Sequence, residues 1–439
     1  MVTKSSRRLV VVVASALAAC TALAACSVGT KPSTSTAGGS ASPHKVSAPT
    51  KKVTISFASW VGDQPAMKKL YAGFHKKYPN ITVKFNNIPS DSEAQKLVTM
   101  VAGGTAPDVA YIDGGSVSDF ASRNALVNLD GYVAGSKVVK RDDYVENFME
   151  GAVYQKSLYG LPFDAETTGL FYRTDYFKAA GISGPPKTWA EFEADAKKLT
   201  DPSKKRYGIA IFGPEAGYYV QPFVASAGGQ LLSADGKKAM IDSPEAVRGA
   251  SFYTGLAKYA PPAYLNSNSY DGRVAFEHGE AAMYIAGSWF GGSLISEAPK
   301  IKGKWATAPL PQDKKCATQV AGDSLVMFNQ SKNQDAAWLW MQYLSSPESL
   351  RQWNVGQADS TELPPVKSLL TAPDTFDGKR WLASFAKMMS CQVISTNSPQ
   401  WSQIQDRLNK DLTKVIYGKM SAQEAMQDTQ KYANRLIGS

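Results

Sequence analysis

Alternating strand and helix patterns near the start of the folded region constrain the fold of this chain more than any other feature. Val53, Ile55 and Phe57 alternate with smaller or more polar residues, a period of two that predicts a strand. Residues 67–74 then place apolar side chains on one helix face, and strand, helix and strand patterns follow as far as residue 112. This order predicts an α/β fold built on a parallel sheet with right-handed crossovers.

The first 26 residues resemble the signal of an exported bacterial lipoprotein. Three basic residues precede an uncharged apolar run from Leu9 to Ala25, and small residues lead into Cys26. Residues 1–25 are therefore expected to be a signal peptide, with Cys26 lipidated on the extracytoplasmic face of the cell membrane. The sequence around Cys20 fits the same pattern, and Cys26 is preferred because a polar linker follows it directly. A transmembrane anchor is the alternative, and both interpretations predict an exported chain.

Residues 26–50 have the composition of a disordered tether, rich in Ser, Thr, Pro and Gly and without an aromatic residue. The formal net charge of +10 is concentrated in the leader and this tether. Seven of the positive charges precede Asp63, which leaves +3 for residues 63–439. That balance is typical of a solvated surface, and no basic stripe alternates with aromatic residues, so the sequence predicts no nucleic-acid partner.

Two cysteines remain in the exported part of the chain, Cys316 and Cys391. Two lone thiols in an oxidising compartment usually pair, so we expect a disulfide between them. Two unrelated free thiols are the alternative.

Several segments together resemble a known family. They are Phe74–Ile81, Gly103–Val109, Tyr159–Pro162, Leu170–Arg173, Pro185–Trp189, and Phe276–Met283 leading to Trp289. In this order and spacing the chain resembles the family 1 extracellular solute-binding proteins of bacterial ABC importers, the group that includes maltose-type sugar receptors.

The resemblance implies a two-lobe α/β fold of the type II periplasmic-binding-protein class, with a three-crossing hinge and an interlobe cleft. The crossings are expected near Pro162, Leu310 and Val355. The first lobe would combine residues 51–162 with 311–355, and the second 163–310 with 356–439. A monomer would bind ligand in the cleft, close by hinge bending and deliver the ligand to ABC permease subunits. On this layout Cys316 and Cys391 fall in different lobes or close to the hinge, where a disulfide would limit opening.

A carbohydrate ligand needs carboxylates or amides for its hydroxyls and aromatic rings for its apolar faces. Such side chains follow several predicted strands or lie in Gly-rich loops, where open α/β sheets hold ligands. The predicted ligand-binding residues are Trp60, Asp63, Asp113, Asp164, Glu166, Tyr218, Tyr219, Trp289, Gly322, Asp323, Trp353 and Glu362, with Thr361 beside the last. For Asp113, Gly322, Asp323, Trp353 and Glu362 the prediction rests on the resemblance.

Other roles stay open for some of these residues. Trp60 could be a core residue, Asp113 could cap a turn, and Asp164 and Glu166 could form a hinge salt bridge. Tryptophans 338, 340 and 381 have the pattern of helix core residues.

Catalytic signatures are absent from the sequence. The three histidines lack metal-ligand spacing, and phosphate-loop, nucleophile-elbow and dinucleotide motifs do not occur. We therefore expect a binding protein without a cofactor or metal. A glycoside hydrolase needs only two carboxylates and remains an alternative. So does a receptor for a peptide, a polyamine or glycerol phosphate; Arg173 and Arg273 would be the cations to examine for a phosphate.

Overall fold

The computed structural model describes residues 41–262, 272–355, 362–394, 396 and 398–438. The predicted signal peptide over residues 1–25, the lipidation site Cys26 and the predicted ligand-loop residue Thr361 lie outside these ranges.

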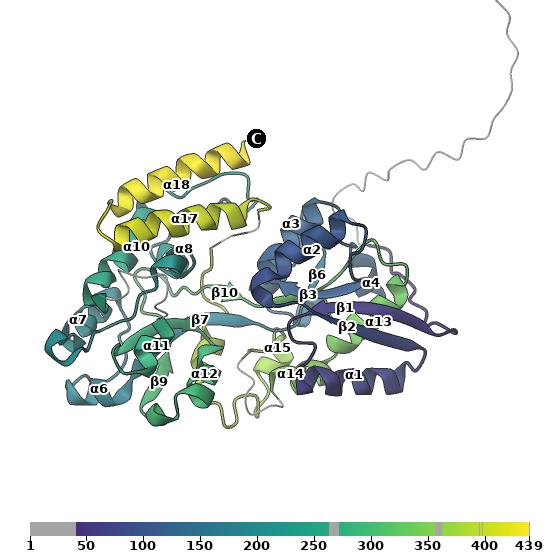
Figure 1. Cartoon of the computed structure of the whole chain (residues 1–439), viewed down its shortest axis with the longest axis horizontal. Helices are drawn as coiled ribbons and strands as arrows, with labels where there is room; N and C mark the ends of the chain where they lie inside the picture. The colour runs from purple at the N-terminus through teal and green to yellow at the C-terminus, as the bar shows by residue number, and fades with distance from the viewer. Residues whose placement is uncertain (1–40, 263–271, 356–361, 395, 397, 439) are drawn as a thin grey trace, which may run out of the picture. The chain divides into compact units, whose positions relative to one another are not determined.

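The first lobe is built on a five-stranded sheet in the order β2-β1-β3-β11-β6 (Figure 1). Its strands are β1 (Val53–Ser59), β2 (Ile81–Asn87), β3 (Val109–Asp113), β6 (Gly160–Pro162) and β11 (Asp323–Met327). Strand β1 pairs in parallel with β2 and β3, which confirms the parallel arrangement predicted from the alternating pattern. Strand β11 is antiparallel to both β3 and β6, so the complete sheet is mixed.

Helices bury apolar stripes against this sheet. In α1 (Pro65–Lys77) the buried residues Met67, Leu70 and Phe74 follow helical spacing, and Pro at the first turn supports the helix start. Phe74 contacts the fully buried Trp340, whose ring centroid lies 4.9 Å away. The other helices of this lobe are α2 (Glu93–Ala102), α3 (Val117–Ser122), α4 (Asp130–Gly135), α5 (Glu146–Gly151), α13 (Gln334–Leu344) and α14 (Pro347–Asn354), beside the hairpin of β4 (Val153–Tyr154) and β5 (Ser157–Leu158).

The second lobe surrounds the long strand β7 (Glu166–Arg173). Strands β8 (Met283–Gly287), β9 (Trp305–Ala308) and β10 (Val320–Ala321) all pair antiparallel to it. Helix α7 (Trp189–Leu199) begins with the capping box predicted from Thr188 and Glu191. The lobe's other helices are α6 (Thr174–Ala179), α8 (Ala216–Tyr219), α9 (Gln221–Ser226), α10 (Pro244–Gly255), α11 (Gly272–Glu277), α12 (Phe290–Glu297), α16 (Leu382–Met388), α17 (Trp401–Ile416) and α18 (Ala422–Ile437).

The second crossing between lobes lies later than expected. Residues 311–321, predicted in the first lobe, pack against the second: Ser226 Oγ donates to Lys315 O at 2.7 Å, and Thr318 Oγ1 donates to Thr168 O at 2.9 Å. Strand β10 then pairs with β7. The boundary therefore moves from near Leu310 to Gly322, because this segment completes the edge of the second sheet.

The third crossing also differs from the expected layout. Val366 and the following helix α15 (Lys367–Leu370) were predicted in the second lobe, yet Val366 and Leu369 are buried in the first lobe's core. Ser368 N donates to Asp143 Oδ1 at 3.0 Å. Apolar contacts thus keep this segment with the first lobe beyond Val355.

The end of the predicted tether is ordered against the first lobe, so the prediction of disorder as far as residue 50 is wrong for residues 41–50. His44 Nε2 lies 2.9 Å from Asp335 Oδ1, and Ser47 N donates to Asp335 Oδ2 at 3.0 Å. Asn80 Nδ2 donates to Pro49 O at 3.0 Å. The local composition does not predict these contacts, because Asp335, the partner of His44 and Ser47, lies far away in the sequence.

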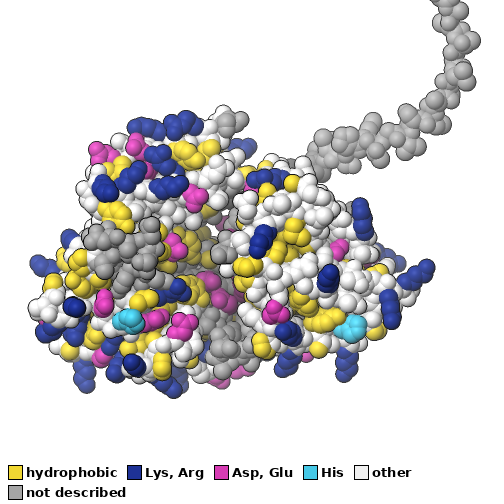
Figure 2. Space-filling view, in the orientation of Figure 1, with side chains coloured by type: hydrophobic (Ala, Val, Ile, Leu, Met, Phe, Trp, Pro, Cys, Tyr) yellow, Lys and Arg dark blue, Asp and Glu magenta, His cyan; other side chains and the backbone are white. Residues whose placement is uncertain are grey.

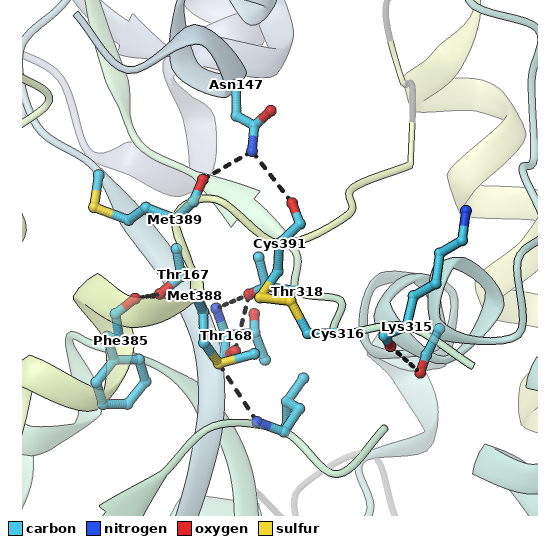
Figure 3. The surroundings of a disulfide bond; sticks show 12 residues. Asn147, Thr167, Thr168, Lys315, Cys316, Thr318, Phe385, Met388, Met389 and Cys391 are labelled. Carbon is cyan, nitrogen blue, oxygen red and sulfur yellow. Dashed lines mark hydrogen bonds between the residues drawn. A yellow bond between two sulfur atoms is a disulfide. The ribbon is translucent and has the colours of Figure 1, made fainter. Parts of the chain in front are cut away.

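Cys316 and Cys391 form a disulfide (Figure 3). It joins the segment before β10 to the segment after α16, and Cys316 O accepts a hydrogen bond from Gln392 N at 3.0 Å. Because residues 311–321 pack with the second lobe, this disulfide does not tie the two lobes together.

Across the described ranges, none of the helices has both the length and the apolar character that crossing a membrane requires.

Candidate functional site

A cavity of about 450 Å³ lies where residues of both lobes meet. The first lobe contributes Asp113 and the start of β11, and the second contributes Tyr218, Gln221 and the segment from Val393 to Gln405. Figure 2 shows acidic side chains in the hollow between the lobes. The cavity therefore has an acidic floor and an aromatic and amide-bearing wall.

The centre of the acidic floor is the hydroxyl of Tyr111. Its Oη lies 2.5 Å from Asp164 Oδ2 and 2.5 Å from Asp323 Oδ2. A phenol has one proton, so it can donate to only one of these carboxyl groups. The other contact requires a proton on the second carboxyl group, which then donates to Oη.

The remaining contacts show which carboxyl group is ionised. Asp164 is buried and accepts further hydrogen bonds from Asp323 N at 2.9 Å and from Trp353 Nε1 at 3.4 Å. These donors favour its charged form. Among the described residues no comparable set of donors reaches the Asp323 carboxyl group, so we assign the proton to Asp323.

Burial raises the pKa of every carboxyl group in this cluster, and repulsion between charges adds to the shift at Asp323 and Glu166. Burial raises the pKa of Asp164 to about 6, held down by its hydrogen bonds. Burial, followed by repulsion from Asp164 and Asp113, raises the pKa of Asp323 well above its ordinary value. The pKa of Glu166 rises to about 8 through burial and then the charges of Asp323 and Asp164. Asp113 faces the cavity as an exposed residue, yet the surrounding protein raises its pKa too.

Strand pairing brings these acids together. Asp323 and Asp113 are register partners across β11 and β3, and Ala321 is the partner of Glu166 across β10 and β7. Gly322 connects the two strands with φ of +140°, and a Cβ added there would lie 2.5 Å from Asp164 O. Only glycine lets the backbone pass this closely from one sheet to the other.

Five of the predicted ligand-binding residues line the cavity: Asp113, Asp164, Tyr218, Gly322 and Asp323. Three more lie in the layer behind it. Trp353 is buried and donates to Asp164, while Glu166 and Glu362 share a hydrogen bond that requires a proton on one of them. Asp164 accepts hydrogen bonds from uncharged donors, so its contacts do not match the alternative of a hinge salt bridge. The capping alternative for Asp113 is present as well, because its Oδ1 accepts from Gly115 N at 2.8 Å.

Four predicted residues lie outside the cavity. Asp63 is exposed and contacts Asn87 and Lys68, and Trp60 packs on the ring of Tyr111 at 4.7 Å. Tyr219 is buried in the second lobe's core, so Tyr218 is the one of the pair that faces the cavity.

Trp289 also lies outside the cavity, with Arg273 over its ring at 5.5 Å. Arg173 is buried and bonded to Asp175 at 2.7 Å, which removes it as a cation for a phosphate-bearing ligand. Neither arginine is among the cavity-lining residues.

Three important residues were missed in the sequence. Tyr111 precedes Asp113 by two positions in the same strand, so period-two alternation points both side chains to one side, a signal that could have identified it. Gln319 lines the cavity, and Glu93 approaches Asp113 closely enough for their charges to interact. Neither has a local sequence signal, because each reaches the site through tertiary packing.

The cluster does not have the geometry of a metal site. Within the described ranges, no group of three or more His, Cys, Asp or Glu side chains could hold a metal ion.

Comparison with known proteins gives a family match over most of the folded chain. The family model described as bacterial extracellular solute-binding protein matches residues 58–350. A relative from Brucella abortus (strain 2308), named only as a binding protein, is 26% identical over 377 residues, covering 85% of this chain and 90% of the relative.

Two solved structures share the fold. The sugar-binding protein MalE from Xanthomonas citri matches with a TM-score of 0.78 and 26% identity, covering 88% of this chain and 98% of that one. A solute-binding protein of an ABC transporter from Thermotoga lettingae, solved with α-D-tagatose bound, matches with a TM-score of 0.75 and 28% identity, covering 88% and 100%. These similarities confirm the predicted two-lobe type II fold.

Proposed function

Because the chain belongs to the bacterial extracellular solute-binding proteins, we propose that it captures a carbohydrate, most simply an oligosaccharide, and passes it to the permease of an ABC importer. The family consists of solute receptors that act outside the cytoplasm and not of enzymes. The carbohydrate, its delivery and the absence of catalysis are our proposals for this chain.

The cavity where the two lobes meet carries the proposal. Carboxyl groups of Asp113, Asp164 and Asp323 line it together with the rings of Tyr218 and Trp401. Carboxylates accept hydrogen bonds from sugar hydroxyls, and aromatic rings cover the apolar C–H faces of a sugar. The sugar-binding and tagatose-bound relatives support the same ligand class.

The test is calorimetry on residues 41–439 with a panel of mono- and oligosaccharides, followed by recovery of the sugar. We expect one sugar series to bind and to be recovered unchanged. Release of reducing sugar from an oligosaccharide would instead identify a glycoside hydrolase. Binding of peptides or polyamines with no sugar bound would overturn the carbohydrate ligand and leave a receptor for another solute.

We further propose that a monomer is held at the extracytoplasmic face by acyl chains on Cys26. The basic, apolar and small-residue pattern before this cysteine supports the anchor. Cys26→Ser should move the protein from the membrane fraction to the soluble exported fraction, whereas the matched variant Cys20→Ser should leave it in the membrane. The opposite pattern would assign the lipid to Cys20.

A further inference from the structure

Resting on the proposed function, we propose that the carbohydrate carries a protonated amine, as in an oligosaccharide of amino sugars, and that Asp113, Asp323 and the amide oxygen of Gln319 receive it. The cavity's charge, its hydrogen-bonding inventory and one buried unpaired acceptor each point to a cationic donor group.

The charged side chains that line the cavity are mostly acidic. They are Asp113, Asp119, Arg123, Glu150, Asp164 and Asp323. Arg123 is the one cation among the lining residues that the structure describes, and it is bonded to Asp119 with 3.0 Å between Nε and Oδ1. No described lysine or arginine of the lining therefore balances the acids of the floor.

Two of the amide side chains that line the cavity, Gln221 and Asn147, use their donors within the protein. Gln221 Nε2 donates to Gly217 O at 3.2 Å and to Gln405 Oε1 at 3.3 Å. Asn147 Nδ2 donates to Met389 O at 2.9 Å and reaches Cys391 O at 3.4 Å, beside the disulfide (Figure 3). These side chains consequently have little capacity left for the lone pairs of a sugar hydroxyl.

One buried acceptor atom of the lining, in contrast, is left over. Gln319 is 8% exposed and lines the cavity, and its Oε1 has no hydrogen-bond partner among the described residues. A buried acceptor without a donor is costly, so a ligand that supplies donors is favoured here.

An ammonium group fits this inventory better than a hydroxyl. It has three N–H donors and no lone pair to satisfy, whereas a hydroxyl has one donor and two lone pairs. Repulsion from Asp164 and Asp113 also contributes to the raised pKa of Asp323. A cation bound between these groups would favour loss of the proton from Asp323 and form charge-assisted hydrogen bonds with Asp113 and the ionised Asp323.

The experiment is calorimetry with matched sugar pairs at about pH 6, where amines are protonated. The glucosamine dimer would be compared with cellobiose, which has hydroxyls in place of its amines, and galactosamine and mannosamine with galactose and mannose. We expect at least one amine to bind about tenfold or more tightly than its neutral partner, the effect of one additional net hydrogen bond.

Two variants locate the amine. Asp113→Asn keeps the acceptor oxygen that Gly115 N uses and should reduce the preference for the amine to about threefold or less, since one charge is lost. Asp323→Asn should do the same, because an amide cannot lose a proton to become the charged acceptor of the amine; melting curves would show that the variant folds. The exposed-site control Glu193→Gln, whose carboxylate pairs with Lys258 at 2.7 Å, should leave the preference unchanged.

The outcomes separate this inference from the function on which it rests. Neutral sugars that bind as tightly as their amines would overturn the amine and leave the carbohydrate receptor standing. Tight binding of spermidine with no sugar bound, or no binding by any sugar, would overturn the carbohydrate and both proposals with it. A preference for the amine that survives in both Asp113→Asn and Asp323→Asn would overturn the assigned contacts.

Discussion

At the scale of single residues, the site depends on one shared hydroxyl group and one glycine. Tyr111 places a single hydroxyl between two carboxyl groups, and Gly322 allows the backbone to pass against Asp164 O. Both residues contact Asp164, which lines the cavity, although only Gly322 was predicted as a site residue from the sequence. Their removal should affect stability and binding together.

Tyr111→Phe should lower the free energy of unfolding by about 1–3 kcal/mol, because Asp164 and Asp323 would lose the hydroxyl that they share in a buried place. Urea unfolding measures the change. Tyr78→Phe is the control, since its half-buried ring packs near Phe74 and it should cost less than about 0.5 kcal/mol. Equal losses in both variants would show that the shared hydroxyl has no special role.

Gly322→Ala should destabilise the protein by about 1–3 kcal/mol, because alanine is strained at φ of +140° and its Cβ would meet Asp164 O at 2.5 Å. Gly303→Ala is the matched control: its φ of +74° is also positive, but an added Cβ would meet nothing within 4 Å. The excess loss at Gly322, measured by thermal unfolding, isolates the close contact. A loss no larger than that at Gly303 would argue against it.

At the scale of elements, the strands and helices were well predicted and their side-chain partners were not. Periodic apolar residues and the Thr188 capping box identified β1, β2, β3 and α7, since each depends on neighbours in sequence. Gln319 reaches the cavity, and Glu93 approaches Asp113, through packing between distant segments, so no local pattern marks them. The acids after β3 and β6 were predicted because strand ends are recognisable in sequence.

The disulfide acts at the scale of elements, because it joins two segments that both continue into the cavity lining. Cys316 lies 75 residues from Cys391 in sequence, and the chain-entropy model gives about 4 kcal/mol of stabilisation for such a loop. The double variant Cys316→Ser/Cys391→Ser should therefore melt at a lower temperature than the wild type. Dithiothreitol should lower the melting temperature of the wild type and leave that of the double variant unchanged; a fall in both would indicate a general effect of the reductant.

At the scale of the whole molecule, the resemblance predicted two lobes but misplaced two boundaries. Residues 311–321 complete the second sheet, while Val366 and Leu369 fill the first lobe's core. Composition does not change at either point, and the hydrophobic pattern does not say which core a segment joins. The expected conflict between the disulfide and lobe opening came from the misplaced boundary near Leu310.

The acidic cluster also makes the stability of the whole molecule depend on pH. Burial raises the pKa of Glu93 and of Glu166 to about 8, and that of Asp164 to about 6, from ordinary values near 4. The folded protein therefore binds more protons than the unfolded chain between about pH 4 and pH 8, so the free energy of unfolding falls as pH rises through this range. Exposed acids held in ion pairs, such as Asp201, have lowered pKa values, so their contribution to the free energy of unfolding is lost only below about pH 4.

Melting temperatures from about pH 5 to pH 8.5 should consequently decrease, and Glu93→Gln should flatten the decrease because a neutral amide replaces one of the protonated acids. The control variant Glu193→Gln should keep the wild-type slope, because the pKa of Glu193 is lowered by Lys258 and not raised by burial. A melting temperature that rises over this range would contradict the buried cluster. Below about pH 7, where the amine stays protonated, a bound amine would favour the charged carboxylates, so a saturating amino sugar should reduce the slope while a neutral sugar should leave it nearly unchanged.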